Sequence, residues 1–191
     1  AIPNTTACIS QTSVGVGEMM QDWGACIPNA VRRNPDIIML GEISTPESMK
    51  NAISAARAGH VVYTTLHAGS VALAFSRIIN EFPENEQSMA REALITTVRG
   101  VVHQSLLTMK DGMKRIAVYE WLELDSYERK KLTDAGVNGL YQALESLVKT
   151  RGQTQLTDLE SKKEIIDPDS YLSTYRSLTD RNKTDENNGH G

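Results

Sequence analysis

The strongest constraint on the fold is a pair of short apolar runs that each lead to a residue able to do chemistry. Residues 37–40 run into Gly41 and Glu42, and residues 61–65 lead to His67. Both runs are too short for helices and are bounded by Pro or Gly, which is typical of buried parallel strands. Open α/β sheets bind ligands at the carboxyl ends of such strands. The sequence therefore predicts a site where Glu42 and His67 leave two strands.

The stretch between the two runs predicts a helix over residues 46–58. Thr45 is a good N-cap, Pro46 suits the first helical position, and Glu47 complements the helix dipole. Gly59 provides the stop. A strand, a helix and a strand at this spacing predict a right-handed βαβ crossover and a parallel sheet.

Elsewhere the pattern predicts helices joined by turns and one hairpin. A helix over residues 18–33 is interrupted by Pro28, where a kink is expected, and another begins at the cap Ser70 and ends at Pro83. Lys110-Asp111-Gly112 predicts a turn between two antiparallel strands. The remaining predictions are helices over residues 86–102, 127–135, 140–149, 156–163 and 169–178, strands over 104–109 and 115–124, and a disordered polar tail over 179–191.

Composition excludes several classes of protein. A net charge of −4 and few aromatic residues leave no basic stripe, so no direct nucleic-acid binding is expected. The two cysteines, Cys8 and Cys26, form no CxxC motif and predict reduced, buried thiols in a cytosolic protein. No apolar run approaches the roughly 20 residues that span a bilayer. Any membrane association is therefore expected to depend on partners.

Glu42 and His67 are the candidate catalytic residues. An acidic residue at a strand end suits the binding of Mg²⁺ or its water in a nucleotide hydrolase; the alternative is a glutamate that caps the next helix or lies at a sheet edge. His67 precedes a small-residue turn from which it could reach a terminal phosphate, or it could be structural. His60 is expected to lie at a helix C-terminus. His103 is expected to have only a packing role.

Other chemistries lack their minimum motifs. The chain has no HExxH, CxxC or GxSxG motif, which argues against a zinc protease, a zinc ribbon and an α/β-hydrolase. None of its 13 glycines is followed by Lys, so the chain contains no Gly-Lys-Ser/Thr phosphate-binding loop. We expect that absence to limit what the chain does alone.

Three stretches, residues 10–15, 30–42 and 58–67, resemble the secretion ATPases of type II and type IV secretion, conjugative transfer and the type IV pilus. The second stretch looks like the family's Walker B segment and the third like its histidine box. The likeness continues weakly through residues 98–107, and residues 136–156 look like the family's helical C-terminal unit. The closest branch is expected to be type IVB secretion and conjugation, or thin-pilus assembly.

The resemblance implies an α/β fold: a RecA-like P-loop NTPase half-core, with a parallel sheet, flanking helices and a β-hairpin, plus a helical C-terminal unit. The division expected is residues 1–124 for the core, 125–178 for the helical unit and 179–191 for the tail. The implied subunit hydrolyses ATP with Mg²⁺ in a hexameric ring. It would be cytoplasmic and peripheral at the inner membrane, through secretion or pilus platform proteins.

The resemblance also assigns roles to residues. Glu42 would coordinate Mg²⁺ or polarise water, and His67 would sense the γ-phosphate. Gly41, Arg32 and Arg33 would complete the nucleotide-binding set, although the two arginines could equally be a solvated helix end.

Departures from the family pattern qualify these roles. Ser44-Thr45 stand where Arg-Asp is common, and Thr12-Ser13 stand where Arg-Glu is common. The family's Walker A loop and acidic box are expected before Ala1, so the chain is expected to be a C-terminal portion that is inactive alone. The rival reading is a non-catalytic assembly module that keeps these strands as scaffold.

Overall fold

Two compact units make up the chain, residues 1–66 and 67–191. The computed structural model describes residues 9–13 and 23–188. The division lies between Leu66 and His67. The boundary expected at residue 124, between the core and the helical unit, stays a prediction. Within the described ranges, no helix combines the length and apolarity needed to cross a bilayer.

The first unit contains two parallel strands joined by a helix. Strand β1 (Ile37–Met39) pairs in parallel with β2 (Val61–Tyr63), and α2 (Pro46–Arg57) connects them. Thr45 caps α2 by accepting a hydrogen bond from the Ser48 N–H at 3.2 Å. Gly59, after the helix, has a φ of +101°, which glycine adopts at no steric cost. The predicted strand–helix–strand arrangement with parallel pairing is confirmed.

Among the residues that the structure describes, one face of this strand pair is covered and the other is exposed. Ile38 and Leu40 are buried, and so is Met49 of α2, the helix that packs against β2. On the opposite face, Met39 and Tyr63 are 78% and 59% exposed. The prediction of buried strands is therefore wrong for this face. Parallel sheets normally have both faces covered, and the described residues of this unit supply only one covering layer.

Helix α1 (Trp23–Val31) packs against α2 and contains Pro28. Its Ile27 is buried. The helix predicted over residues 18–33 is confirmed over this range, and residues 18–22 lie outside the described part of the chain. The chain leaves the helix through Asn34, whose φ of 49° is left-handed.

The second unit is organised on an antiparallel hairpin. Strand β3 (Gly100–Thr108) pairs along its length with β4 (Arg115–Glu123). The Asp111 carboxylate accepts a hydrogen bond from the Lys114 N–H at 3.0 Å, and Gly112 has a φ of +68°. The predicted Asp-Gly hairpin is confirmed.

Two helices, α3 (Val71–Asn80) and α4 (Glu84–Thr97), precede the hairpin. The helix predicted over residues 86–102 ends earlier, because residues 100–102 join β3. Val101 and Val102 are β-branched and pair there with Leu122 and Trp121 of β4. Cross-strand pairing has overridden the helical periodicity at this junction.

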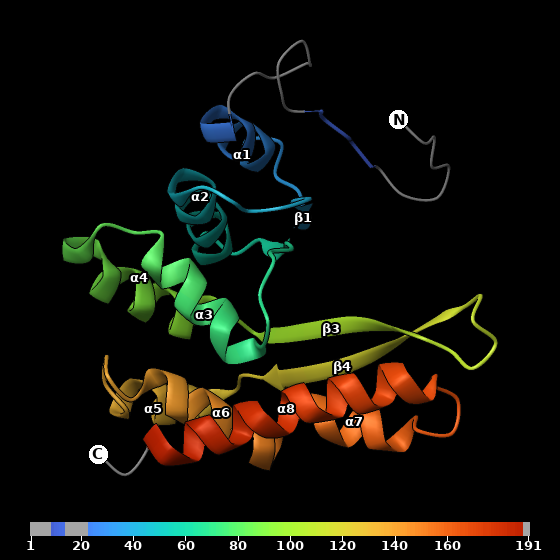
Figure 1. Cartoon of the computed structure of the whole chain (residues 1–191). Coiled ribbons are helices and arrows are strands. Elements are labelled where there is room, and N and C mark those ends of the chain that lie inside the picture. Colours follow the sequence, from blue (N-terminus) through green and yellow to red (C-terminus); the bar gives the residue numbers. More distant parts are fainter. Residues whose placement is uncertain (1–8, 14–22, 189–191) are drawn as a thin grey trace. The chain divides into compact units, whose positions relative to one another are not determined.

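In the part of the chain that the structure describes, four helices follow β4, as the sequence predicted. A cluster of Val118, Leu159, Ile166 and Leu178 forms the core between the hairpin and the last two of them, and Figure 1 shows these two running along the hairpin. Their packing on β4 explains why hairpin and helices form one unit. The helices are α5 (Ser126–Asp134), α6 (Leu140–Arg151), α7 (Gln155–Ser161) and α8 (Pro168–Asn188).

Helix α8 is longer than predicted. It continues past Leu178 to Asn188, so disorder from Thr179 onward is wrong for residues 179–188. The sequence contains no Gly or Pro between Pro168 and Gly189 that would end the helix.

Candidate functional site

The backbone on both sides of residues 41–42 is bonded to the last residue of β2 and to the segment that follows this strand. The Leu40 N–H donates to the Tyr63 carbonyl at 2.8 Å, and the Ile43 N–H donates to the Thr65 carbonyl at 3.0 Å. The carboxyl ends of both strands therefore lie at one edge of the first unit. Residues 41–42 form a short bridge that is fixed at both of its ends.

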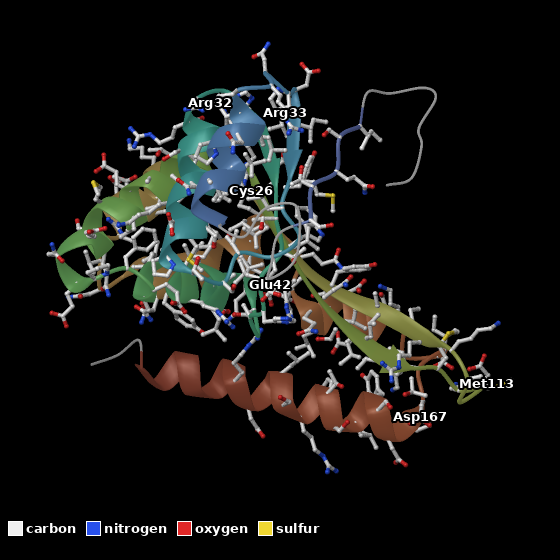
Figure 2. The ribbon with its side chains drawn as sticks, turned by 90° about the horizontal axis from the view of Figure 1, so that it is seen from above. Cys26, Arg32, Arg33, Glu42, Met113 and Asp167 are labelled. Carbon is white, nitrogen blue, oxygen red and sulfur yellow. The ribbon has the colours of Figure 1, made fainter. Side chains whose placement is uncertain are left out.

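Glu42 is exposed on this bridge and is labelled in Figure 2. The Thr65 hydroxyl donates to the carbonyl of Gly41, and a Cβ placed on Gly41 would meet nothing within 4 Å. A carboxylate on fixed backbone with open space beside it fits a magnesium ion, which takes one or two protein carboxylates and completes its shell with phosphate and water. Among the described residues, no group of three or more His, Cys, Asp or Glu could hold a metal by itself.

The N-terminus of α2 begins immediately after this bridge. Thr45 and Ser48 form a reciprocal capping box, in which the Thr45 N–H also donates to the Ser48 hydroxyl at 3.2 Å. Thr45, and not Glu42, is therefore the cap of α2. The residue that departs from the family's Arg-Asp pattern thus has a structural role of its own.

Arg32 and Arg33 are exposed just beyond the C-terminal end of α1. Arg33 Nη1 donates to the Ser10 hydroxyl at 2.8 Å. Both arginines precede β1, whereas Glu42 follows it, and Figure 2 shows them well separated from Glu42 within the unit. The structure does not bring them to the strand edge where Glu42 lies.

His67 is the exposed first residue of the second unit. Its backbone carbonyl accepts a hydrogen bond from Arg77 Nη1 at 2.6 Å. Ser70, fully buried, caps α3 by accepting from the Leu73 N–H at 3.1 Å. The imidazole thus belongs to the turn that leads into α3, where the Val71 N–H already donates to the Glu120 carboxylate and the Leu73 N–H to the Ser70 hydroxyl.

Two other candidates have structural surroundings. The His60 backbone N–H donates to the Ala55 carbonyl at 3.3 Å, as expected of a helix end, and its Nδ1 lies 2.7 Å from the Pro35 carbonyl. Cys26 is a free, partly buried thiol. Burial raises the pKa of Cys26 more than Arg33 lowers it, which disfavours a reactive thiolate. Cys8 lies outside the described residues.

Sequence reasoning missed a buried ion pair in the second unit. Glu120 on β4 is 1% exposed and pairs with Arg181 of α8 at 3.1 Å. The available signal was the alternation of β4, in which Glu120 lies between Val118 and Leu122 on the buried face.

Comparison with known proteins agrees with the resemblance read from the motifs. The family model "Type II/IV secretion system protein" matches residues 6–181. The chain is 32% identical over 135 residues to a twitching motility protein of Neisseria gonorrhoeae, which covers 71% of this chain and 36% of that protein. It is 33% identical over 124 residues to the type IV pilus retraction ATPase PilT of Pseudomonas aeruginosa, covering 65% and 36%. The chain therefore spans about a third of the length of these relatives.

Solved structures share its α/β fold. The X-ray structure of the Legionella pneumophila ATPase DotB matches with a TM-score of 0.80 and 30% identity, over 85% of this chain and 44% of DotB. The structure of the pilus retraction motor PilT with bound ADP matches with a TM-score of 0.69 and 28% identity, over 83% and 45%. With these matches and the family model over residues 6–181, the chain belongs to the type II/IV secretion system protein family.

Proposed function

We propose that this chain is part of a subunit of a secretion or pilus motor that hydrolyses ATP, and that it supplies the Walker B carboxylate and the phosphate-sensing histidine. The observation that carries the proposal is the bridge of residues 41–42, which holds an exposed carboxylate at the carboxyl edge of two parallel strands. Ligands bind at such edges in open α/β sheets. The similarity to the ATPases DotB and PilT supports the same conclusion.

In this proposal Glu42 holds Mg²⁺ through a water or polarises the attacking water, and Gly41 leaves room for the nucleotide. A bound magnesium ion would neutralise charge that develops on the phosphates. His67 would contact the γ-phosphate from the turn before α3 and so distinguish ATP from ADP. Positioning and electrostatics supply most of the rate in phosphoryl transfer, which suits a carboxylate held on a fixed backbone bridge.

The proposed assembly is a hexameric ring of cytoplasmic subunits, peripheral at the inner membrane through secretion or pilus platform proteins. The likeness to DotB supports the type IVB branch over the others. Within the ring subunit, residues 1–124 would belong to a RecA-like core and residues 125–178 to its helical unit. Arg32 and Arg33 remain predicted nucleotide-binding residues, and their place before β1 argues against a contact at the same edge as Glu42.

The chain contains no phosphate-binding loop, so the 191-residue protein is expected to bind ATP weakly. Without the loop's backbone N–H groups and lysine, most contacts to the β- and γ-phosphates are missing. Titration calorimetry with Mg²⁺-ATP should give a Kd weaker than about 1 mM, equivalent to less than about 4 kcal/mol of binding free energy. Micromolar affinity would contradict the proposed division of the site.

The rival function is a non-catalytic assembly module, favoured by one observation. Ser44-Thr45 stand where the family pattern expected from the sequence has Arg-Asp, so one positive and one negative side chain are missing near Glu42. The protein encoded by the complete reading frame separates the two functions. Steady ATP turnover by that protein supports the motor, and nucleotide-independent assembly without turnover supports the module.

A further inference from the structure

The carboxylate of Glu120 is buried on β4 and has a partner at each oxygen. Its Oε1 accepts a hydrogen bond from the Val71 N–H at 2.7 Å. Its Oε2 accepts from Arg181 Nη2 at 3.1 Å. A buried carboxylate is tolerated only when it is paired and hydrogen-bonded, and both conditions hold here.

Arg181 makes a second contact that reaches the turn after His67. Its Nη1 donates to the Gly69 carbonyl at 3.1 Å. The guanidinium therefore joins the carboxylate of Glu120 to the backbone of Gly69, while Glu120 itself holds Val71. Residues 69–71, which lead from His67 into α3, are thus bonded to both β4 and α8.

The two contacts to Glu120 and Gly69 require the separate N–H donors of an arginine side chain. A guanidinium presents separate N–H donors in a rigid fork, whereas the single ammonium of lysine is a point charge on a flexible chain. Since replacing a buried ion pair by apolar residues is often neutral or stabilising, the pair is a poor explanation of stability alone. What it adds is a defined position for the backbone of residues 69–71.

His103 lies opposite Glu120 in the hairpin but does not compete with Arg181 as its cationic partner. Burial lowers the pKa of His103, Glu120 opposes that shift, and Arg181 adds to it. The net lowering keeps the imidazole neutral at physiological pH. Arg181 is therefore the cation paired with Glu120.

We propose that Arg181 is a positioning residue, through which α8 and Glu120 fix the turn that carries His67. The effect on ATP turnover rests on the proposed role of His67, whereas the effect on the turn does not. The C-terminal helix would then control how the sensing histidine is presented, although it lies far from it in sequence.

Hydrogen exchange on the 191-residue protein tests the bridge directly. Arg181→Gln should raise the exchange rates of amides in residues 68–72, above all that of the Val71 amide, which donates to Glu120. We expect an increase of about tenfold to a hundredfold, because Glu120 loses its cationic partner and the Gly69 carbonyl loses its donor. Arg176→Gln, on an exposed position of the same helix, is the matched control and should leave these rates unchanged. Unchanged protection of residues 68–72 in Arg181→Gln would overturn the bridge.

If the Tm shows that Arg181→Gln does not fold, Arg181→Lys, which keeps the charge, provides the test instead. Partial protection is expected, because one ammonium cannot hold Gly69 and Glu120 with the same geometry; full protection would overturn the two-contact bridge. The NMR signal of the His67 ring should shift or broaden in Arg181→Gln and stay unchanged in Arg176→Gln.

ATP turnover by the protein of the complete reading frame tests whether Arg181 affects catalysis through His67. Arg181→Gln should lower kcat more than it changes the affinity for ADP, and an unchanged kcat with a loosened turn would overturn the positioning role. That outcome is distinct from failure of the proposed function, which would appear as normal turnover when His67 itself is replaced.

Discussion

Replacing Glu42 by Gln is expected to stop ATP turnover while leaving nucleotide binding nearly intact. Glutamine has the same size and keeps the bridge at residues 41–42, but it can neither accept a proton from the attacking water nor attract Mg²⁺ as a carboxylate does. General-base groups typically contribute about 10²–10⁴-fold to a rate, which sets the expected loss of kcat. The measurement is steady-state phosphate release by the protein of the complete reading frame, with ATP affinity followed in parallel.

Glu47→Gln is the matched control for this prediction. Glu47 lies five positions further along the chain, in the first turn of α2, and its side chain is exposed. Its replacement removes the same charge from the same region and should change kcat little. Equal losses in the two variants would show that only the general negative charge matters, and unchanged turnover in Glu42→Gln would refute the role given to Glu42.

Replacing His67 by Ala should lower turnover by about 10²-fold, comparable to removing one preorganised donor that faces developing charge. Its second effect is more diagnostic. A residue that contacts the γ-phosphate improves binding of ATP but not of ADP, so the ratio of the two affinities should move toward one. Competition binding with both nucleotides measures that ratio.

His60→Gln is the control for the histidine. Its ring lies against the Pro35 carbonyl, so the variant is expected to change the Tm. It should leave the ratio of ATP to ADP affinity unaltered. A ratio that stays at its wild-type value in His67→Ala would argue that His67 is structural.

The local features of the site were predictable because short-range rules decide them. Thr45, Pro46 and Gly59 bracket α2 by cap chemistry, proline placement and a left-handed φ, and all three lie where the sequence placed them. The Asp111-Gly112 turn follows from equally local chemistry. The parallel pairing of β1 and β2 was predictable from the length of the connection between them.

Long-range features were not predictable. Exposure of Met39 and Tyr63 depends on which layer covers the strand pair, and that is not encoded in the strands themselves. The change from helix to strand at Gly100 is decided by pairing with β4. Glu120 and Arg181 are 61 residues apart, and only tertiary packing brings them together.

The central claim of the proposed function is that Glu42 and His67 both serve ATP hydrolysis, and a double-variant cycle on kcat tests it most directly. Residues that work as a unit in catalysis lose little more when both are removed than when the more important one is removed. The account predicts that Glu42→Gln/His67→Ala turns over ATP at about the rate of Glu42→Gln alone. A loss equal to the product of the two single losses would show that the residues act independently, and would contradict the account.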